Sequence, residues 1–141
     1  MHRDYLVGEL QRESRLAAYA LVRGIAPTFA EADWHALSDG SRPWRIISVR
    51  DVAGRVRGLA VYSLRMHPRA GLLLDVPIFI ALSAVGNQEI ARSLFACLIE
   101  EASPCHFLRV WNEFPHNLKQ MEDTRFFRQW DHGLIFRVPP G

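Results

Sequence analysis

The chain has 141 residues, of which 49% are apolar and 23% are charged, and this composition is typical of a soluble globular protein with a single domain over residues 1–141. Its net charge of +2 is too small to indicate nucleic acid or an acidic membrane surface as a partner, so we expect neither. The sequence contains no run of about 18 apolar residues, which would predict a membrane span. No signal peptide is recognisable either. We therefore expect a cytoplasmic protein.

The first part of the chain has the apolar spacing of helices. Apolar residues recur near one face of Tyr5–Arg23, which predicts a first helix. Gly24 is placed to be the C′ residue beyond its end. Thr28 and Glu31 form the S/T-x-x-E capping signature, which predicts a short second helix over Phe29–Leu37.

Three β-rich segments follow. Trp44–Arg50 and Arg55–Met66 are separated by the turn DVAG and therefore predict an antiparallel hairpin. Leu72–Leu82 is apolar enough to be a central strand. Pro77 lies inside that strand and has no N–H to donate, which predicts a bulge or an unpaired position there.

A strand, a helix and a strand come in succession in the second half. Leu82–Ala102 has the pattern of a turn followed by an amphipathic helix, and Cys105–Trp111 has the pattern of a strand. This order predicts a crossover between parallel neighbouring strands. Asn117–Trp130 is helical in pattern, and Gly133–Val138 predicts a last strand. The expected fold class is α/β, with a mixed sheet of antiparallel strands followed by a βαβ crossover.

Several kinds of site are excluded by spacing. No two histidines have metal-ligand spacing, and neither Cys97 nor Cys105 pairs with one, so we expect no metal. Both cysteines are expected to be buried reduced thiols, and a disulfide between them is the alternative. The hydrolase G-x-S-x-G motif, the dinucleotide fingerprint and the P-loop do not occur.

Three segments carry a resemblance to a known family. They are IARSLFACLIEEA (Ile90–Ala102), HFLRVW (His106–Trp111) and RFFRQWDHG (Arg125–Gly133). In this order they resemble the helix after the acyl-CoA loop, the next strand, and the closing helix and turn of the GNAT family, the Gcn5-related N-acetyltransferases. The resemblance covers about Thr28–Val138 and implies the GNAT acyltransferase fold. The family usually has a strand before its first helices, and we predict none here.

The resemblance implies acetyl-CoA as the cofactor, with its pyrophosphate at the turn before the helix. Free backbone N–H groups and the positive end of the helix dipole meet an anion there. The family motif Q/R-x-x-G-x-G/A falls on Gly86–Ala91. The cofactor-binding residues implied are Ile80 and Leu82 at the end of the preceding strand, and Gly86, Asn87 and Ala91 in the motif.

Glu89 stands at the place of the central motif glycine. A carboxylate about 5 Å from a pyrophosphate oxygen would oppose binding by roughly 3 kcal/mol at an effective dielectric constant near 20. An acid in the first turn also stabilises a helix that binds no ligand, through the helix dipole. The turn therefore suits an empty helix end at least as well as one that binds phosphate.

Acetyl transfer to an amine requires a group that accepts the amine's proton. Asp75 on the central strand is one candidate, and its alternative is a solvated or capping aspartate. Tyr62 is the second candidate, and its alternative is a core tyrosine. Many GNAT proteins have a tyrosine in the closing helix that protonates the leaving thiolate. Phe126 or Phe127 stands at that place and donates no proton.

The sequence thus predicts an acetyl-CoA-dependent N-acetyltransferase that acts on a small-molecule or peptide amine. The alternative is a GNAT-fold protein that has lost catalysis and serves as a binding or regulatory module, and a third reading is an unrelated α/β interaction domain. A homodimer is left open. A row of arginines is interpreted either as a solvated face or as a contact for the 3′-phosphate of coenzyme A or an acidic partner: Arg55, Arg57, Arg65 and Arg69.

Overall fold

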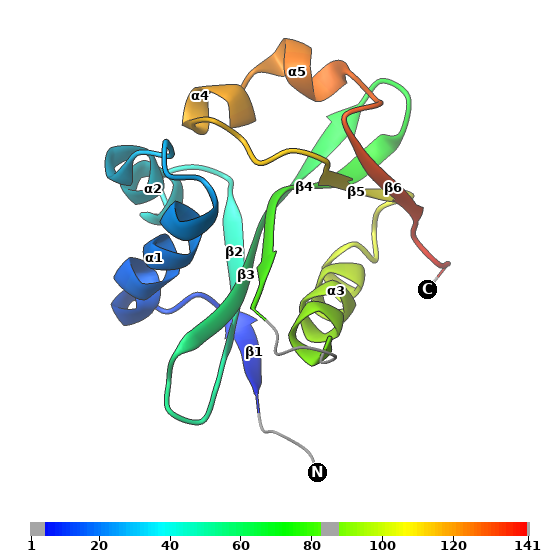
Figure 1. Ribbon diagram of the computed structural model, residues 1–141. Helices are drawn as coiled ribbons and strands as arrows, with labels where there is room; N and C mark the ends of the chain where they lie inside the picture. The colour runs from blue at the N-terminus through cyan, green and yellow to red at the C-terminus, as the bar shows by residue number, and fades with distance from the viewer. Residues whose placement is uncertain (1–4, 83–87, 141) are drawn as a thin grey trace.

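The computed structural model describes residues 5–82 and 88–140, which form a six-stranded sheet with helices on both faces (Figure 1). The strands lie side by side in sequence order. Only β4 and β5 run parallel among the strands described, and every other neighbouring pair is antiparallel. The strands are β1 (Leu6–Glu9), β2 (Arg45–Arg50), β3 (Val56–His67), β4 (Gly71–Ala81), β5 (Phe107–Trp111) and β6 (Gly133–Arg137).

The sheet separates two layers of the core, and helices cover each layer. One face of the sheet, called here the α1 face, is covered by α1 (Arg15–Ile25), α2 (Glu31–Ser38), α4 (Leu118–Met121) and α5 (Thr124–Arg128). The opposite face, the α3 face, is covered by α3 (Glu89–Glu101). None of the helices described has the length and apolar character needed to cross a membrane.

The expected hairpin and crossover are confirmed. β2 and β3 pair antiparallel, and β4 and β5 pair parallel on either side of α3. The irregularity expected at Pro77 is also present. Val61 pairs with Ile78 and Ser63 with Asp75, so one β3 residue faces two β4 residues, Val76 and Pro77, which is a β-bulge.

The prediction for Tyr5–Arg23 is wrong in its first half. Leu6–Glu9 is the edge strand β1, paired with β2, and a short 3-10 turn leads to α1 at Arg15. The strand that we did not predict before the first helices is therefore present. Four exposed residues carry almost no local signal, and pairing with β2 decides their conformation. Gly24 lies inside α1 and does not end it.

Two helix boundaries also differ from expectation. α2 begins at Glu31 after Ala30, with no side-chain cap, so Thr28 does not form the expected capping box. The helix predicted over Asn117–Trp130 is two short helices. It breaks because the Asp123 carboxylate accepts hydrogen bonds from the N–H groups of Arg125 and Phe126 and so starts a new helix.

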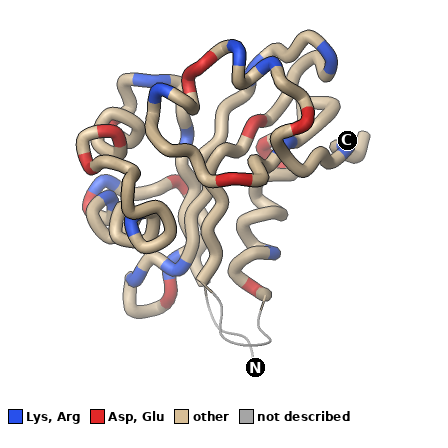
Figure 2. Tube along the Cα trace, turned by 45° about the horizontal axis from the view of Figure 1, so that its top comes forward, with Lys and Arg blue, Asp and Glu red and all other residues tan. Residues whose placement is uncertain are grey.

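The row of arginines does not form one solvated face. Arg55 is exposed and forms an ion pair with Asp51, whereas the Arg65 guanidinium lies over a buried phenyl ring. Charged residues of both signs are interspersed along the turns and helices (Figure 2).

Gly58 allows α3 to approach β3 closely. A Cβ atom at this position would lie 2.8 Å from the carbonyl oxygen of Ile80 and 2.8 Å from a methyl group of Ile90. Because the Ile80 oxygen belongs to the backbone of the sheet, it cannot move aside cheaply. Gly24 has nothing within 4 Å of its ideal Cβ position.

We expect Gly58→Ala to lower the free energy of unfolding by about 1–3 kcal/mol, as overpacking does in well-packed cores. Gly24→Ala is the matched control and should raise it by about 0.5–1 kcal/mol, because alanine is favoured in a helix. Urea denaturation followed by circular dichroism measures both. Equal stability of Gly58→Ala and the wild type would show that the contact between α3 and β3 is loose.

Candidate functional site

A buried ion pair joins β4 to β5 on the α1 face. Asp75 and Arg109 are register partners on the two parallel strands. The Arg109 Nε atom lies 2.8 Å from Asp75 Oδ1, and both side chains are 0% exposed. The same carboxylate oxygen accepts a hydrogen bond of 3.1 Å from the indole N–H of Trp111, the last residue of β5. One carboxylate therefore holds two side chains of β5.

Arg109 also fixes the segment that follows α4. Its Nη2 donates to the carbonyl oxygen of Phe127 at 3.1 Å, and its Nη1 to that of Gln129 at 2.7 Å. These carbonyls lie at the C-terminal end of α5, where helix carbonyls lack partners within the helix. The guanidinium thus attaches the end of α5 to the sheet.

Three nitrogen-bearing side chains surround the phenyl ring of Phe127. The Arg65 guanidinium carbon lies 3.7 Å from the ring centroid and that of Arg109 lies 5.3 Å away. The His67 ring contacts the phenyl edge with centroids 5.1 Å apart. His67 Nδ1 accepts a hydrogen bond from the backbone N–H of Arg69. Burial lowers the pKa of His67, and the positive charge of Arg109 lowers it further.

His132 contacts Phe126 of α5 and Trp111 of β5. Its ring stacks on Phe126 with centroids 4.1 Å apart and meets the Trp111 ring edge-on at 4.9 Å. Burial, followed by the nearby Arg109 charge, also lowers the pKa of His132. We call Arg65, His67, Asp75, Arg109 and His132 the polar cluster, in which Arg65 and His132 are half-buried and the other three are buried.

Strand pairing between β4 and β5 stops just beyond this cluster. The last paired residues are Val76 and Val110, and β4 then continues to Ala81 with no β5 partner in the part of the chain described. β5 ends at Trp111, and the chain leaves toward α4 (Figure 1). We call Pro77–Ala81, on the side that faced β5, the open side of β4.

The direction of the β4 backbone N–H groups follows from one hydrogen bond. The N–H of Leu82 donates to the carbonyl oxygen of Arg57 on the β3 side at 2.8 Å. In an extended strand, alternate residues direct their N–H groups to the same side. The N–H of Ile80 therefore also faces β3, whereas those of Phe79 and Ala81 face the open side.

The structure separates the residues predicted for catalysis. Asp75 lies inside the ion pair on the α1 face, whereas Tyr62 is buried on the α3 face. The Tyr62 side chain lines a hollow of about 350 Å³ together with Arg45, Cys97 and Glu101. Burial raises the pKa of the Tyr62 phenol, and the nearby Glu101 carboxylate raises it further.

The residues implied for cofactor binding are placed only in part. Ile80 and Leu82 direct their N–H groups toward β3, so these two donors are turned away from the open side. Ala91 lies in the first turn of α3, and Glu89 is the first residue of that helix. Gly86 and Asn87 lie outside the described residues.

The structure gives the state of the two cysteines and tests for a cluster of metal ligands. Cys97 and Cys105 are free thiols, as expected, but only Cys105 is buried and Cys97 is half-buried. Burial raises the pKa of each thiol. In residues 5–82 and 88–140, no three His, Cys, Asp or Glu side chains gather closely enough to hold a metal ion.

Sequence reasoning missed Arg109, Trp111 and the inward position of Arg65. The sequence nevertheless contained a signal for the buried ion pair. LLLDVPIFI contains one acid and HFLRVW one arginine, and both segments are otherwise almost entirely apolar. A charge buried on one strand requires a partner, and the two strands were already expected to be parallel neighbours.

We expect Asp75→Asn to lower the free energy of unfolding by about 3–5 kcal/mol, because it leaves the Arg109 charge buried without its counter-ion. Arg55→Gln breaks the exposed ion pair with Asp51 and should cost at most about 1 kcal/mol. Urea denaturation measures both. A cost for Asp75→Asn no greater than that for Arg55→Gln would contradict the burial of the pair.

The lowered pKa of His67 predicts loss of stability in acid. Its neutral form is favoured in the folded state, while the unfolded pKa is about 6.5. As the pH falls below that value, the unfolded chain binds more protons and the free energy of unfolding decreases. His67→Gln should reduce this slope, and the exposed His116→Gln should not. Identical slopes for the wild type and His67→Gln, measured by urea denaturation between about pH 4.5 and 7.5, would rule out this role.

Comparison with known proteins finds matches in structure and none in sequence. No protein-family model matches the chain, and no curated protein matches its sequence. The aminoglycoside N-acetyltransferase AAC(6′)-Iy in complex with CoA matches its fold with a TM-score of 0.67 and 11% identity, over 99% of this chain and 94% of that one. YhbS from Escherichia coli, a GNAT family N-acetyltransferase in complex with CoA, matches with a TM-score of 0.62 and 14% identity, over 89% and 69%.

A third match lies within a larger enzyme. The GCN5-related glucosamine N-acetyltransferase region of a fungal multidomain β-N-acetylglucosaminidase matches 82% of this chain with a TM-score of 0.66 and 8% identity. This chain spans 14% of the length of that protein. The resemblance inferred from three short segments is therefore confirmed at the level of structure: the chain has the mixed α/β fold of the GNAT N-acetyltransferases.

Proposed function

We propose that the chain binds an acyl-CoA along the open side of β4 and transfers the acyl group to an amine. The observation that carries this proposal is the end of β4–β5 pairing at Val76 and Val110, which leaves the N–H groups of Phe79 and Ala81 directed away from β3. These donors belong to a central strand, so their positions are fixed by the sheet.

The spacing of the two donors suits an extended ligand. N–H groups two residues apart on a strand are separated by about 6.8 Å. An extended chain with amide carbonyls can add to such an edge as a further strand would, with main-chain hydrogen bonds supplying the affinity. A backbone N–H also polarises a carbonyl oxygen that gains negative charge during attack by an amine. The pantetheine arm and the thioester of an acyl-CoA have these groups.

The start of α3 fits the phosphate end of this ligand less well. Glu89 is the acidic residue of the first turn, and a carboxylate there opposes a diphosphate at the same helix end. The described residues therefore favour binding through the acyl and pantetheine end. Bound acyl-CoA would supply an activated thioester, and the chain would position its carbonyl.

Proton transfer is the weaker part of the chemistry. The Asp75 carboxylate is held by Arg109 and Trp111, and Tyr62 lies on the opposite face of the sheet. Phe127 is buried under Arg65 and carries no hydroxyl. The amine's proton would then leave to water, so we infer a slow reaction on a small-molecule or peptide amine.

The same observations support a second candidate function. A GNAT-fold protein that binds an acyl-CoA without turnover needs the open side of β4 but no acid or base. Asp75 is engaged in its buried ion pair and Tyr62 is buried on the α3 face, so the lack of an available acid or base favours such a binding or regulatory module.

We expect Ala81→Pro to weaken acetyl-CoA binding at least about tenfold, as loss of a backbone donor in a shielded site costs about 1.5 kcal/mol or more. Proline removes the N–H directed to the open side and spares the hydrogen bonds to β3. Ala81→Val keeps the N–H and should bind as the wild type does. Isothermal titration calorimetry measures the three affinities, and equal binding by both variants would contradict the proposed contact.

Release of free thiol in the presence of an amine separates the two candidate functions. Thiol release that depends on the amine and is lost in Ala81→Pro supports the transferase. Acetyl-CoA binding without thiol release for a panel of small and peptide amines supports the binding module. Failure of the wild type to bind acetyl-CoA would contradict both candidate functions.

A further inference from the structure

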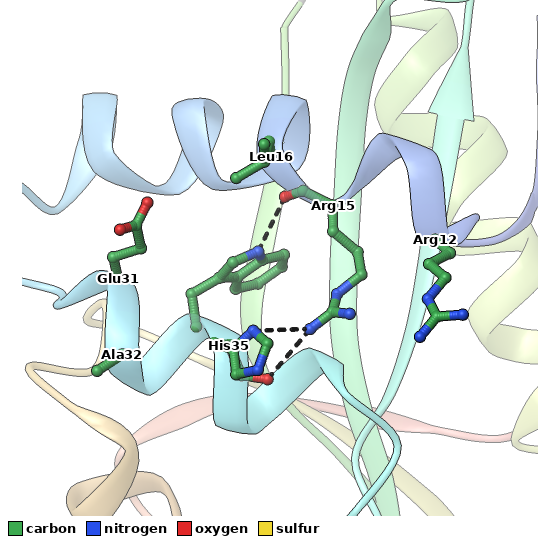
Figure 3. Close-up of a pocket in the computed structure, with 7 residues that line it drawn as sticks. Arg12, Arg15, Leu16, Glu31, Ala32 and His35 are labelled. Carbon is green, nitrogen blue, oxygen red and sulfur yellow. Dashed lines mark hydrogen bonds between the residues drawn. The ribbon is translucent and has the colours of Figure 1, made fainter.

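A groove lies between α1 and α2 on the side of these helices that is open to solvent (Figure 3). Its volume is about 500 Å³, within the range of sites that hold small ligands. All its lining residues come from the segment 12–35, so no residue of β4, β5 or α3 takes part. The groove is therefore separate from the open side of β4.

The middle of the groove is apolar and rigid. The indole of Trp34 forms its floor, with the residue only 3% exposed, and its N–H donates to the carbonyl oxygen of Arg15 at 2.9 Å. This bond fixes the ring in one orientation. Leu16 lies on the rim with 75% of its surface exposed. An apolar ligand segment placed in the groove would remove the exposed Leu16 side chain from water.

One end of the groove is cationic and already organised. Arg15 Nε donates to Ser38 Oγ at 3.1 Å, and its Nη2 lies 3.2 Å from His35 Nδ1. Because a guanidinium only donates, His35 Nδ1 is the acceptor of this hydrogen bond. These contacts hold Arg15 in place and leave its Nη1 donors for a ligand. Arg12 extends its guanidinium at the same end (Figure 3). Two guanidinium groups at one end of the groove are suited to a carboxylate.

The other end of the groove is anionic. Glu31 is the carboxylate among the described residues that line the groove, and it lies at the opposite end from Arg12 and Arg15 (Figure 3). Glu31 and His35 are one turn apart on α2, about 6 Å along the helix axis. The two charged ends are therefore separated by at least the length of a short chain of methylene groups.

We propose that this groove binds a small zwitterion whose carboxylate lies at Arg12 and Arg15 and whose ammonium lies at Glu31. An apolar spacer against the exposed Leu16 side chain would join the two charges. ω-Amino carboxylates and dipeptides share this chemistry. The proposal does not rest on acyl-CoA binding, because the groove shares no residue with the open side of β4.

Titration with 6-aminohexanoate, followed by ¹H–¹⁵N NMR, tests the proposal. The indole N–H of Trp34 is the reporter, since it lies in the floor of the groove. We expect a saturable shift with a Kd on the order of 1 mM, because exposed ion pairs contribute little each. Hexanoate and hexylamine each lack one charge and should bind at least about threefold more weakly. Alanyl-alanine in the same titration distinguishes a peptide ligand from an amino-acid ligand.

Three variants assign the charges. Arg12→Gln should weaken 6-aminohexanoate about threefold or more and leave hexylamine unchanged, and Glu31→Gln should weaken it similarly and leave hexanoate unchanged. All these side chains are exposed, so the fold is not at risk. Arg23→Gln lies on the same helix outside the groove and should bind as the wild type does. Absence of a saturable shift, equal affinity for hexanoate and 6-aminohexanoate, or an effect of Arg23→Gln equal to that of Arg12→Gln would overturn the proposal.

Discussion

The carboxylate of Asp75 connects elements that are far apart in the sequence. It pairs with Arg109 on β5 and accepts the indole N–H of Trp111 from the end of the same strand. Arg109 in turn holds the last carbonyls of α5. Both hydrogen bonds to the Asp75 carboxylate use Oδ1, and Oδ2 is buried with no hydrogen-bond partner among the described residues. Breaking an ion pair that is fully removed from water is costly, because a lone buried charge costs several kcal/mol. The position of α5 on the sheet therefore depends on this pair, which also links the neighbouring strands β4 and β5.

The open side of β4 begins where this arrangement ends. Pairing with β5 stops one residue after Asp75, and the bulge at Pro77 falls at the same point. A proline contributes no N–H to a ladder, so a strand partner loses little by departing there. The bulge also changes which residues face each side, and it leaves the N–H groups of Phe79 and Ala81 directed away from β3. The proposed acyl-CoA site is thus built from backbone groups and owes little to side-chain identity.

A site built from backbone groups, as proposed here, is compatible with clear structural similarity at low sequence identity. The fold matches GNAT N-acetyltransferases at TM-scores above 0.6, with identities of 14% or less in the three comparisons described. Backbone N–H groups can be kept through large changes of side chain, provided that strand order and the bulge are kept. Glu89 at the first turn of α3 and Phe127 under Arg65 illustrate such changes. In the proposed acyl-CoA site they would affect the phosphate end and the proton donor, and would leave the strand geometry intact.

The sequence by itself determined the elements with strong local signals. Alternation in Arg55–Met66, the four-residue spacing in α3 and the missing N–H of Pro77 each act over a few neighbouring residues, so the hairpin, the crossover and the bulge were predictable. Tertiary structure alone decided the rest. Leu6–Glu9 is a strand because β2 offers it an edge, and Asp75 is buried because Arg109 lies opposite. Arg65 turns inward because the Phe127 ring is there. Each of these features depends on a partner that is distant in the sequence, and a local sequence pattern cannot identify that partner.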